Sequence, residues 1–102
     1  MTPPAAAATL PPLTLRLYIA SESPNSVAAT KNLYAALARH PALQVNLEVV
    51  DLLRDPERGI RDGVMFTPML VRSEPTPERR LLGSLGNRSA LLSLLGVEES
   101  AP

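Results

Sequence analysis

Residues 13–27 read LTLRLYIASESPNSV, a β-strand pattern followed directly by the start of a helix. Between Leu13 and Ile19 apolar side chains occupy every second position, which is the spacing of a strand with one buried face. Ser23 can then accept a free backbone N–H as a helix cap, and Pro24 loses no hydrogen bond at the first helical position. The stretch therefore predicts a strand, a short loop and a helix.

The predicted helix is amphipathic. Asn25 or Ser26 could also serve as its cap. Pro41 ends the helix, so His40, the single histidine of the chain, is expected at the helix C-terminus in a structural role. One face of the helix is formed, at three- and four-residue spacing, by Val27, Thr30, Leu33, Tyr34 and Leu37.

Downstream of this helix the pattern predicts three more strands and two more helices. In chain order they are a strand over 45–53 that runs deep into the core, a short helix capped by Asp55, a buried strand within 65–71, a strand over 80–85, and a helix from Asn87 to Gly96. Residues 73–78 are expected to form the turn between the last two strands. The order β-α-β-α-β-β-α indicates one α/β domain of thioredoxin-like topology over 13–97.

Composition excludes several functional classes. A length of 102 residues suits one domain, and equal numbers of basic and acidic residues give no field that would attract nucleic acid. The absence of cysteine excludes disulfides, thiolate metal sites, thiol nucleophiles and dithiol redox chemistry. Because neither a membrane span nor a signal peptide is evident, we expect a cytoplasmic protein. Residues 1–12, rich in proline and alanine, are expected to form a disordered tail, and 98–102 a flexible C-terminus.

Five motifs in combination resemble the KaiB family across residues 13–95. They are LRLYIA at 15–20, SPNSV at 23–27, VVDLL at 49–53, TPML at 67–70 and RRLLG at 79–83. The resemblance implies a thioredoxin-like fold without the redox cysteines, and a protein-binding role with no enzyme activity and no cofactor. It also implies partners, because KaiB proteins dock on the N-terminal ATPase ring of the clock kinase KaiC, compete there with the sensor domain of SasA, and help to sequester KaiA.

The resemblance further implies fold switching in the C-terminal half, to an arrangement βαββααβ that does not bind the ATPase ring. Leu94 stands where clock proteins carry a glycine that weakens the last helix. Leucine improves helix propensity by roughly 0.8 kcal/mol and adds about 1.5–3 kcal/mol of burial, so we expect the thioredoxin-like form at rest. Pro68 stands at the cis-proline position of thioredoxin-like proteins, where it would shape the start of a strand. The region expected to switch includes Leu81, Gly83, Asn87 and Leu94.

Seven residues are candidates for partner binding: Arg16, Ser23, Pro24, Asn25, Lys31, Arg79 and Arg80. The paired arginines at 79–80 could hold a partner carboxylate, or they could form a solvated strand edge that discourages aggregation. Clock-type KaiB proteins carry basic residues at three positions that are Ala28, Glu48 and Gly63 here. Three charge contacts to an ATPase ring are therefore missing, which predicts an altered affinity for a standard KaiC.

Three functional classes stay open, and so does self-association into a homo-oligomer. The first is a clock-type adaptor for a KaiC ring. The second is a diverged module for another ATPase or a sensor kinase, and the third is a thiol-independent enzyme. Catalysis by the serines of residues 21–26 is not expected, because only Lys31 is near enough in sequence to act as a base. Asp51, Asp55 and Glu57 are interpreted as helix-capping groups and not as a metal site.

Overall fold

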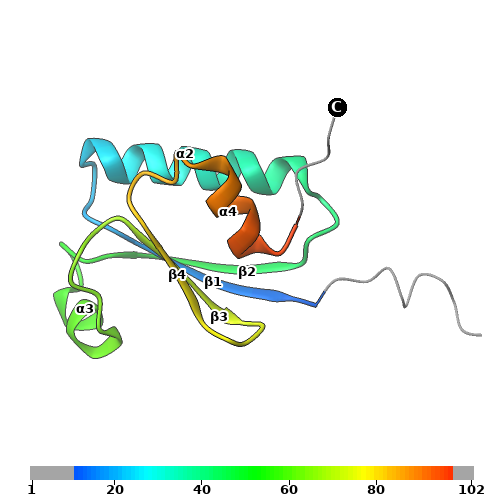
Figure 1. The fold of residues 1–102 in the computed structure, drawn as a ribbon. Helices are drawn as coiled ribbons and strands as arrows, with labels where there is room; N and C mark the ends of the chain where they lie inside the picture. The colour runs from blue at the N-terminus through cyan, green and yellow to red at the C-terminus, as the bar shows by residue number, and fades with distance from the viewer. Residues whose placement is uncertain (1–10, 98–102) are drawn as a thin grey trace, which may run out of the picture.

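Four β-strands form one sheet in the computed structural model, which describes residues 11–97 (Figure 1). In chain order the elements are β1 (Leu13–Ile19), α2 (Pro24–Arg39), β2 (Val45–Asp51), α3 (Pro56–Asp62), β3 (Met69–Glu74), β4 (Arg79–Leu82) and α4 (Arg88–Leu95). The predicted order βαβαββα is confirmed. Residues 1–10 of the expected tail and the whole of 98–102 lie outside the described residues.

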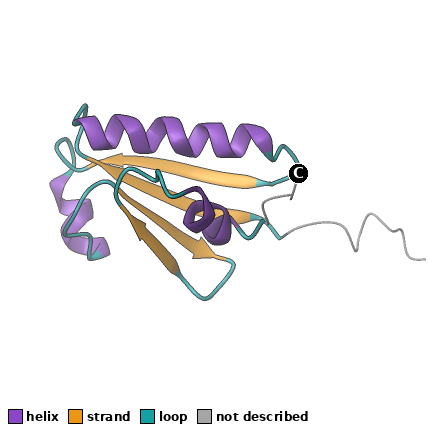
Figure 2. Ribbon diagram, turned by 45° about the horizontal axis from the view of Figure 1, so that its top comes forward, coloured by secondary structure: helices purple, strands orange, loops and turns teal. Residues whose placement is uncertain are grey.

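The strand order β2-β1-β3-β4 places β1 and β3 at the centre of the sheet. β1 runs parallel to β2 and antiparallel to β3, and β4 runs antiparallel to β3. Figures 1 and 2 show α2 and α4 on one face of the sheet, with α3 at one end of the opposite side. The sheet therefore has helical cover on both sides, but α3 covers only part of its face.

The main core lies between the sheet and the helices α2 and α4. The predicted alternation of β1 is confirmed, because Leu13, Leu15 and Leu17 are buried there. Full burial of a leucine side chain contributes about 1.5–3 kcal/mol, so this face of the sheet carries most of the hydrophobic stabilisation. The helices and later segments fill the same core with Ala29, Leu33, Leu70, Leu85, Leu91, Leu92, Leu94 and Leu95.

A second, smaller core lies on the opposite face of the sheet. Tyr18, placed by its spacing on the side away from the main core, is only 1% exposed and packs with Val50, Val64 and Val71. The sequence pattern suggested one buried face for β1, whereas the structure buries both. The reason is that β1 is a central strand, and the residues after α3 cover its other side.

The expected deep strand over residues 45–53 is wrong in two respects. β2 is an edge strand that ends at Asp51, and Leu53 is 68% exposed. A turn begins at Asp51, whose carbonyl accepts hydrogen bonds from the backbone N–H groups of Arg54 (3.1 Å) and Asp55 (2.9 Å). Asp55 begins α3, but its side chain makes no capping hydrogen bond, contrary to the prediction.

The other predicted helix boundaries are confirmed by their caps. The Ser23 hydroxyl accepts a hydrogen bond from the Ser26 N–H at the start of α2, and Asn87 Oδ1 accepts one from the Ala90 N–H at the start of α4. His40 is the residue that follows the last turn of α2. Gly96 ends α4 with a left-handed φ of 79°, a conformation in which glycine carries little penalty.

Arg72 joins α4 and the β3–β4 hairpin to the sheet from a buried position on β3. The side chain is 7% exposed; its Nη1 donates to the Leu94 carbonyl at 2.8 Å and its Nη2 to the Pro77 carbonyl at 3.0 Å. Among residues 11–97 its Nε has no hydrogen-bond partner. The Leu94 carbonyl belongs to the last turn of a helix, where carbonyls lack intrahelical partners and a cation is favoured by the helix dipole. Arg72 therefore completes the C-terminal end of α4.

The segment expected to switch folds is ordered around this helix. Leu81 on β4 packs against the main core, and the Gly83 N–H donates to the Pro68 carbonyl at 2.9 Å with a φ of 104° at the glycine. Leu94 is 2% exposed. These residues hold the thioredoxin-like arrangement, and exchange with the alternative arrangement stays a prediction.

Replacing Leu94 with glycine should destabilise this arrangement by about 4 kcal/mol, because the loss of a buried leucine adds to the loss of helix propensity. Urea denaturation measures the change in the free energy of unfolding. Ser93→Gly is the matched control, since Ser93 is exposed in the same helix and its replacement should cost about 1 kcal/mol or less. Equal losses in the two variants would show that burial of Leu94 is unimportant.

Candidate functional site

One end of the sheet gathers four loops. The carboxyl ends of β1, β2 and β4 and the amino end of β3 meet there, as the pairs Tyr18↔Met69 and Met69↔Leu82 show. We call residues 20–25, 52–55, 63–68 and 82–83 at this end the sheet-end surface. Loops at one end of a rigid sheet are where α/β proteins commonly place their binding residues.

Asp51 organises the sheet-end surface from the last position of β2. Its carboxylate accepts hydrogen bonds from the Ser21 hydroxyl (2.6 Å), the Ser21 N–H (3.0 Å) and the Leu53 N–H (3.0 Å). Ser21 has a positive φ of 43°, which is uncommon outside glycine. The Ser21 hydroxyl is the main reason that the pKa of Asp51 lies below its usual value. Asp51 therefore ties the two loops together, and it is not a helix cap as the sequence suggested.

Ser23 serves the structure of the helix. Its hydroxyl donates to Ser26 Oγ at 2.8 Å, and the buried Ser26 Oγ in turn accepts from the Ala20 N–H at 3.0 Å. A catalytic serine needs a base beside it, but His40 lies at the other end of the 16-residue α2, about 24 Å away along the axis. Lys31 is about two helical turns from Ser23. The loop therefore has the geometry of a helix start and lacks that of a nucleophile site.

Pro68 lies beside this loop at the start of β3. The Thr67–Pro68 peptide bond is cis, as the resemblance implied, and Pro68 is fully buried. The strand begins only at Met69, so the proline lies outside the sheet ladder. Two further cis bonds, Glu74–Pro75 and Thr76–Pro77, occur in the β3–β4 hairpin; the sequence analysis did not predict them.

Arg16 lies on the α3 side of the sheet in a network of charges, away from the sheet-end loops. Its Nε is 3.3 Å from Glu48 Oε1, and Arg58 donates to both oxygens of the same carboxylate at 2.9 Å. The bidentate contact with Arg58 is the main reason that the pKa of Glu48 is lowered. Glu48 is thus held by two arginines of this chain.

Asp62 extends the network to the second core. The Tyr18 hydroxyl donates to Asp62 Oδ2 at 2.6 Å, and Arg58 Nε lies 3.5 Å from the same oxygen without making a hydrogen bond. Burial is the largest cause that raises the pKa of Tyr18, and the hydrogen bond from Tyr18 is the largest that lowers the pKa of Asp62. The network fastens α3 to the sheet.

The two adjacent arginines of β4 differ in their surroundings. Arg80 donates to the carbonyls of Asp62 (3.1 Å) and Gly63 (3.2 Å) at the end of α3, and its Nε donates to Glu78 Oε2 at 2.9 Å. Arg79 is exposed and pairs with Arg72, at the opposite end of the sheet from the sheet-end surface. The contacts of Arg80 favour a structural role for that residue over the capture of a partner carboxylate.

The seven candidates for partner binding do not form one surface. Ser23, Pro24 and Asn25 belong to the sheet-end surface, while Lys31 is exposed on α2. Arg16 lies on the α3 side of the sheet and Arg79 at its far end. The fold brings together only Ser23, Pro24 and Asn25, at the start of α2.

Four large apolar side chains that are exposed on the sheet-end surface were missed, and one of them is Leu82 of β4, which is 54% exposed. Leu53 is 68%, Met65 85% and Phe66 62% exposed. The sequence analysis expected a buried strand within residues 65–71, but the strand begins at Met69, and Met65 and Phe66 are exposed to solvent. The proximity of Pro68, which restricts the conformation of the preceding residue and cannot join the ladder, was the available signal. The exposed residues add an apolar patch to the loops around Ser23.

The family model described as the KaiB domain matches residues 16–97. The chain belongs to the KaiB family. The circadian clock oscillator protein KaiB of Thermostichus vulcanus is 38% identical over 78 residues, which cover 76% of this chain and 72% of that protein. The match therefore covers most of both chains.

Solved structures show that this KaiB-family chain has a thioredoxin-like fold. The N-terminal domain of Synechococcus elongatus SasA matches with a TM-score of 0.68 and 23% identity, over 91% of both chains. Mitochondrial thioredoxin 3 of Saccharomyces cerevisiae matches with a TM-score of 0.68 and 14% identity, over 89% of this chain and 83% of that one. At such identities the likeness concerns the fold alone.

Within the part of the chain that the structure describes, no helix has the length and apolar character to cross a membrane. Across the same residues 11–97, no three histidine, aspartate or glutamate side chains are grouped as metal ligands would be. The carboxylate of Asp51 is engaged by Ser21 and by the Leu53 N–H. The carboxylate of Asp62 is engaged by Tyr18 and Arg58. These carboxylates serve the packing of loops and helices.

Acid should weaken the fold through these carboxylates. The pKa values of Glu48, Asp51 and Asp62 are lowered in the folded state, so the unfolded chain binds more protons as the pH falls below about 5. Their stabilisation is present above the unfolded pKa values, near 4, and is lost as the pH falls through the lower folded values. We expect Asp51→Asn to reduce the slope of unfolding free energy against pH between about pH 5 and 2.

Denaturation with urea at a series of pH values measures that slope. Asp55→Asn is the control, because Asp55 is exposed and its side chain makes no capping hydrogen bond. A variant at Asp51 that kept the full acid dependence of the unmodified chain would contradict the role assigned to its hydrogen bonds.

Proposed function

We propose that this chain is a non-enzymatic, cytoplasmic protein-binding regulator of the KaiB type, which docks on a KaiC-type ATPase ring through its sheet-end surface. The observation that supports this most directly is the thioredoxin-like arrangement of a chain in the KaiB family. The resemblance implies that only this arrangement of KaiB proteins binds the ring. This chain has the same fold as the SasA domain. If both dock on the ATPase ring through that fold, the two proteins would compete for it.

The chemistry of the sheet-end surface favours binding over catalysis. Thioredoxins hold their Cys-x-x-Cys dithiol in the loop where this chain has Ser21 to Ser26, and this chain has no cysteine at all. The hydroxyl groups of Ser21, Ser23 and Ser26 are engaged in hydrogen bonds with Asp51, with one another and with the backbone. The loop keeps its shape and exposure but has lost its nucleophiles.

The apolar patch gives the surface a means of binding a protein. Leu53, Met65 and Phe66 are exposed at the end of the sheet where α2 begins, and aromatic residues are common among interface hot spots. Pro24 and Asn25 would lie at the polar rim of such an interface. The docking role of Arg16, Lys31, Arg79 and Arg80 is less well supported, because these residues lie away from the patch or have contacts within the chain.

A second candidate function is favoured by the charge at three positions. The resemblance implies basic residues in clock-type proteins at the positions of Ala28, Glu48 and Gly63 in this chain. Glu48 also reverses the sign of the charge, although Arg16 and Arg58 surround it. A ring recognised through those basic residues would lose attraction, which favours a diverged member that binds another ATPase or a sensor kinase.

Size-exclusion chromatography with a purified KaiC hexamer and nucleotide tests the main proposal. We expect co-elution with the unmodified chain, and Phe66→Ala should weaken the interaction at least about tenfold, because an exposed aromatic anchor would lose its partner. Failure of the unmodified chain to bind any KaiC hexamer would reject the main proposal and leave the second candidate.

Tyr34→Ala is the matched control for this experiment. Tyr34 is also an exposed aromatic residue, 51% exposed, but it lies in the middle of α2 and away from the sheet-end surface. Its replacement should leave binding unchanged. Equal weakening by Phe66→Ala and Tyr34→Ala would exclude the sheet-end surface as the docking site.

A further inference from the structure

A small cavity lies at the end of the sheet opposite to the sheet-end surface, where β1 begins (Figure 1). Its volume is about 50 Å³. One water molecule needs about 10–15 Å³ of such space, whereas sites for drug-sized ligands start at about 300 Å³. The cavity therefore has room for an occupant of only a few heavy atoms.

The wall of this cavity is apolar except at one residue. Its apolar members come from the start of β1, the loop before β2, the β3–β4 hairpin and the end of α4. They are Pro11, Leu13, Leu43, Pro75, Leu95 and Gly96. The remaining member is Arg72 of β3, and no Asp or Glu is among the described lining residues. The cavity therefore borders a guanidinium in surroundings that water hydrates poorly.

Arg72 brings a positive charge without a counter-ion to this wall. The residue is 7% exposed, and its two hydrogen bonds go to the carbonyls of Leu94 and Pro77. These acceptors carry only partial charges, so the net charge of the guanidinium stays in place. Among residues 11–97, no carboxylate forms an ion pair with it. A buried cation without a counter-ion is costly, and an anion beside it would offset much of that cost.

Arg72 also has hydrogen-bond donors that the fold does not use. A guanidinium offers more N–H groups than the two that donate to Leu94 and Pro77. Its Nε is buried and has no partner among the described residues. A carboxylate can accept two parallel N–H groups of one guanidinium, which gives a short, charge-assisted contact. The unused donors therefore match a carboxylate better than a neutral group.

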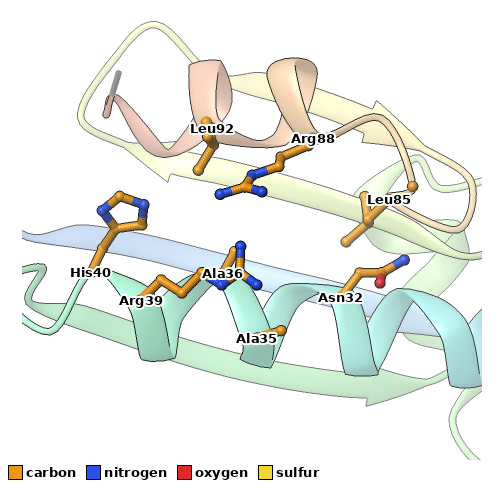
Figure 3. A pocket seen from close by; sticks show the side chains of 9 residues that line it. Asn32, Ala35, Ala36, Arg39, His40, Leu85, Arg88 and Leu92 are labelled. Atoms are coloured by element: carbon orange, nitrogen blue, oxygen red, sulfur yellow. The ribbon is translucent and has the colours of Figure 1, made fainter. Parts of the chain in front are cut away.

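Arg58 and Arg39 show how the chain satisfies other arginines. The side chain of Arg58 is 18% exposed and lies 2.9 Å from Glu48 and 3.5 Å from Asp62, so two carboxylates balance one guanidinium. Arg39, which lines the wider hollow between α2 and α4 in Figure 3, is exposed, so water hydrates its charge. Arg72 has neither the carboxylates of Arg58 nor the solvent around Arg39.

We infer that the cavity beside Arg72 binds a carboxylate group. The guanidinium holds the two carboxylate oxygens, and the leucine and proline side chains cover the short apolar part of the occupant. Because the cavity borders Leu95 and Gly96, an occupant stabilises the docked position of α4 against unfolding. The inference does not depend on the proposed docking function.

Two sources can supply a carboxylate to this cavity. One is a free small acid such as acetate, which has few enough atoms to fit. The other is the pair Glu98 and Glu99, which follow directly after Val97 in the sequence. The chemistry at Arg72 is the same in both cases, so the experiments below test the site first and its source second.

Acetate and acetamide are the probes, because they have nearly the same shape and only acetate carries a charge. Titration of the isotopically labelled full chain at constant ionic strength, followed by ¹H–¹⁵N NMR, should shift the Arg72 Nε–H signal and the amides of Leu13, Leu43 and Gly96. We expect saturation by acetate in the millimolar range, and binding of acetamide at least about tenfold weaker. Equal binding of the two probes, or shifts centred on other residues, would overturn the inference.

Leu43→Phe tests the cavity without replacing Arg72, whose loss would also release the end of α4. The larger side chain should fill the cavity and weaken acetate binding at least about fivefold. Leu47→Phe is the matched control, because Leu47 is also a half-buried leucine at the edge of the main core but does not line the cavity. Circular dichroism checks that both variants are folded. Equal affinities for acetate in the two variants would contradict the site.

The double variant Glu98→Gln with Glu99→Gln identifies the source of the carboxylate. Equal affinity for acetate in this variant and in the unmodified chain supports a free acid as the occupant. Tighter binding of acetate in the double variant supports the chain's own glutamates, because they would compete with acetate for Arg72. The two phenylalanine variants are then compared in that background. Absence of saturable acetate binding from both chains would overturn the inference.

Discussion

The buried guanidinium of Arg72 links the sheet to the end of α4 and to the β3–β4 hairpin. It reaches from a central strand to the Leu94 carbonyl in the last turn of α4 and to the Pro77 carbonyl in the hairpin turn. A buried charge is costly unless hydrogen bonds satisfy it, so these two acceptors must stay where they are. Their positions fix α4 against the sheet, and α4 supplies four leucines of the main core. The arrangement that defines the thioredoxin-like form thus depends on one side chain of β3.

The chain shares the fold of thioredoxins but contains no cysteine. Here the loop that begins α2 is fixed by the Asp51 carboxylate on one side and by Ser26 on the other, so no cysteine is needed to shape it. The cis peptide bond before Pro68 is present beside this loop. The surface that remains is exposed, partly apolar and rigid.

The sequence predicts those features that depend on neighbouring residues along the chain. The alternation of β1, the Ser23 and Asn87 caps and the Gly96 helix end are local, and all appear as expected. Burial of Tyr18 on the second face could not be predicted, because it requires β1 to have a strand on each side and residues after α3 above it. β2 appeared buried for the opposite reason, since apolar composition alone does not distinguish an edge strand from a central one.

The candidate site was predictable only in part for the same reason. The start of α2 was recognised from its cap and its motif, but the exposure of Met65 and Phe66 follows from where β3 begins. Arg80, considered as a partner contact or a strand-edge charge, instead donates to backbone carbonyls at the end of α3.

That contact of Arg80 has a consequence for how the molecule opens. The carbonyls of Asp62 and Gly63 receive their hydrogen bonds from a strand that lies on the far edge of the sheet from β2. If the hairpin detached, the end of α3 would lose both donors at once, and the helix is only seven residues long. Fraying of the outer hairpin would therefore weaken the end of α3, although Tyr18 and Glu48 would still hold that helix to the sheet.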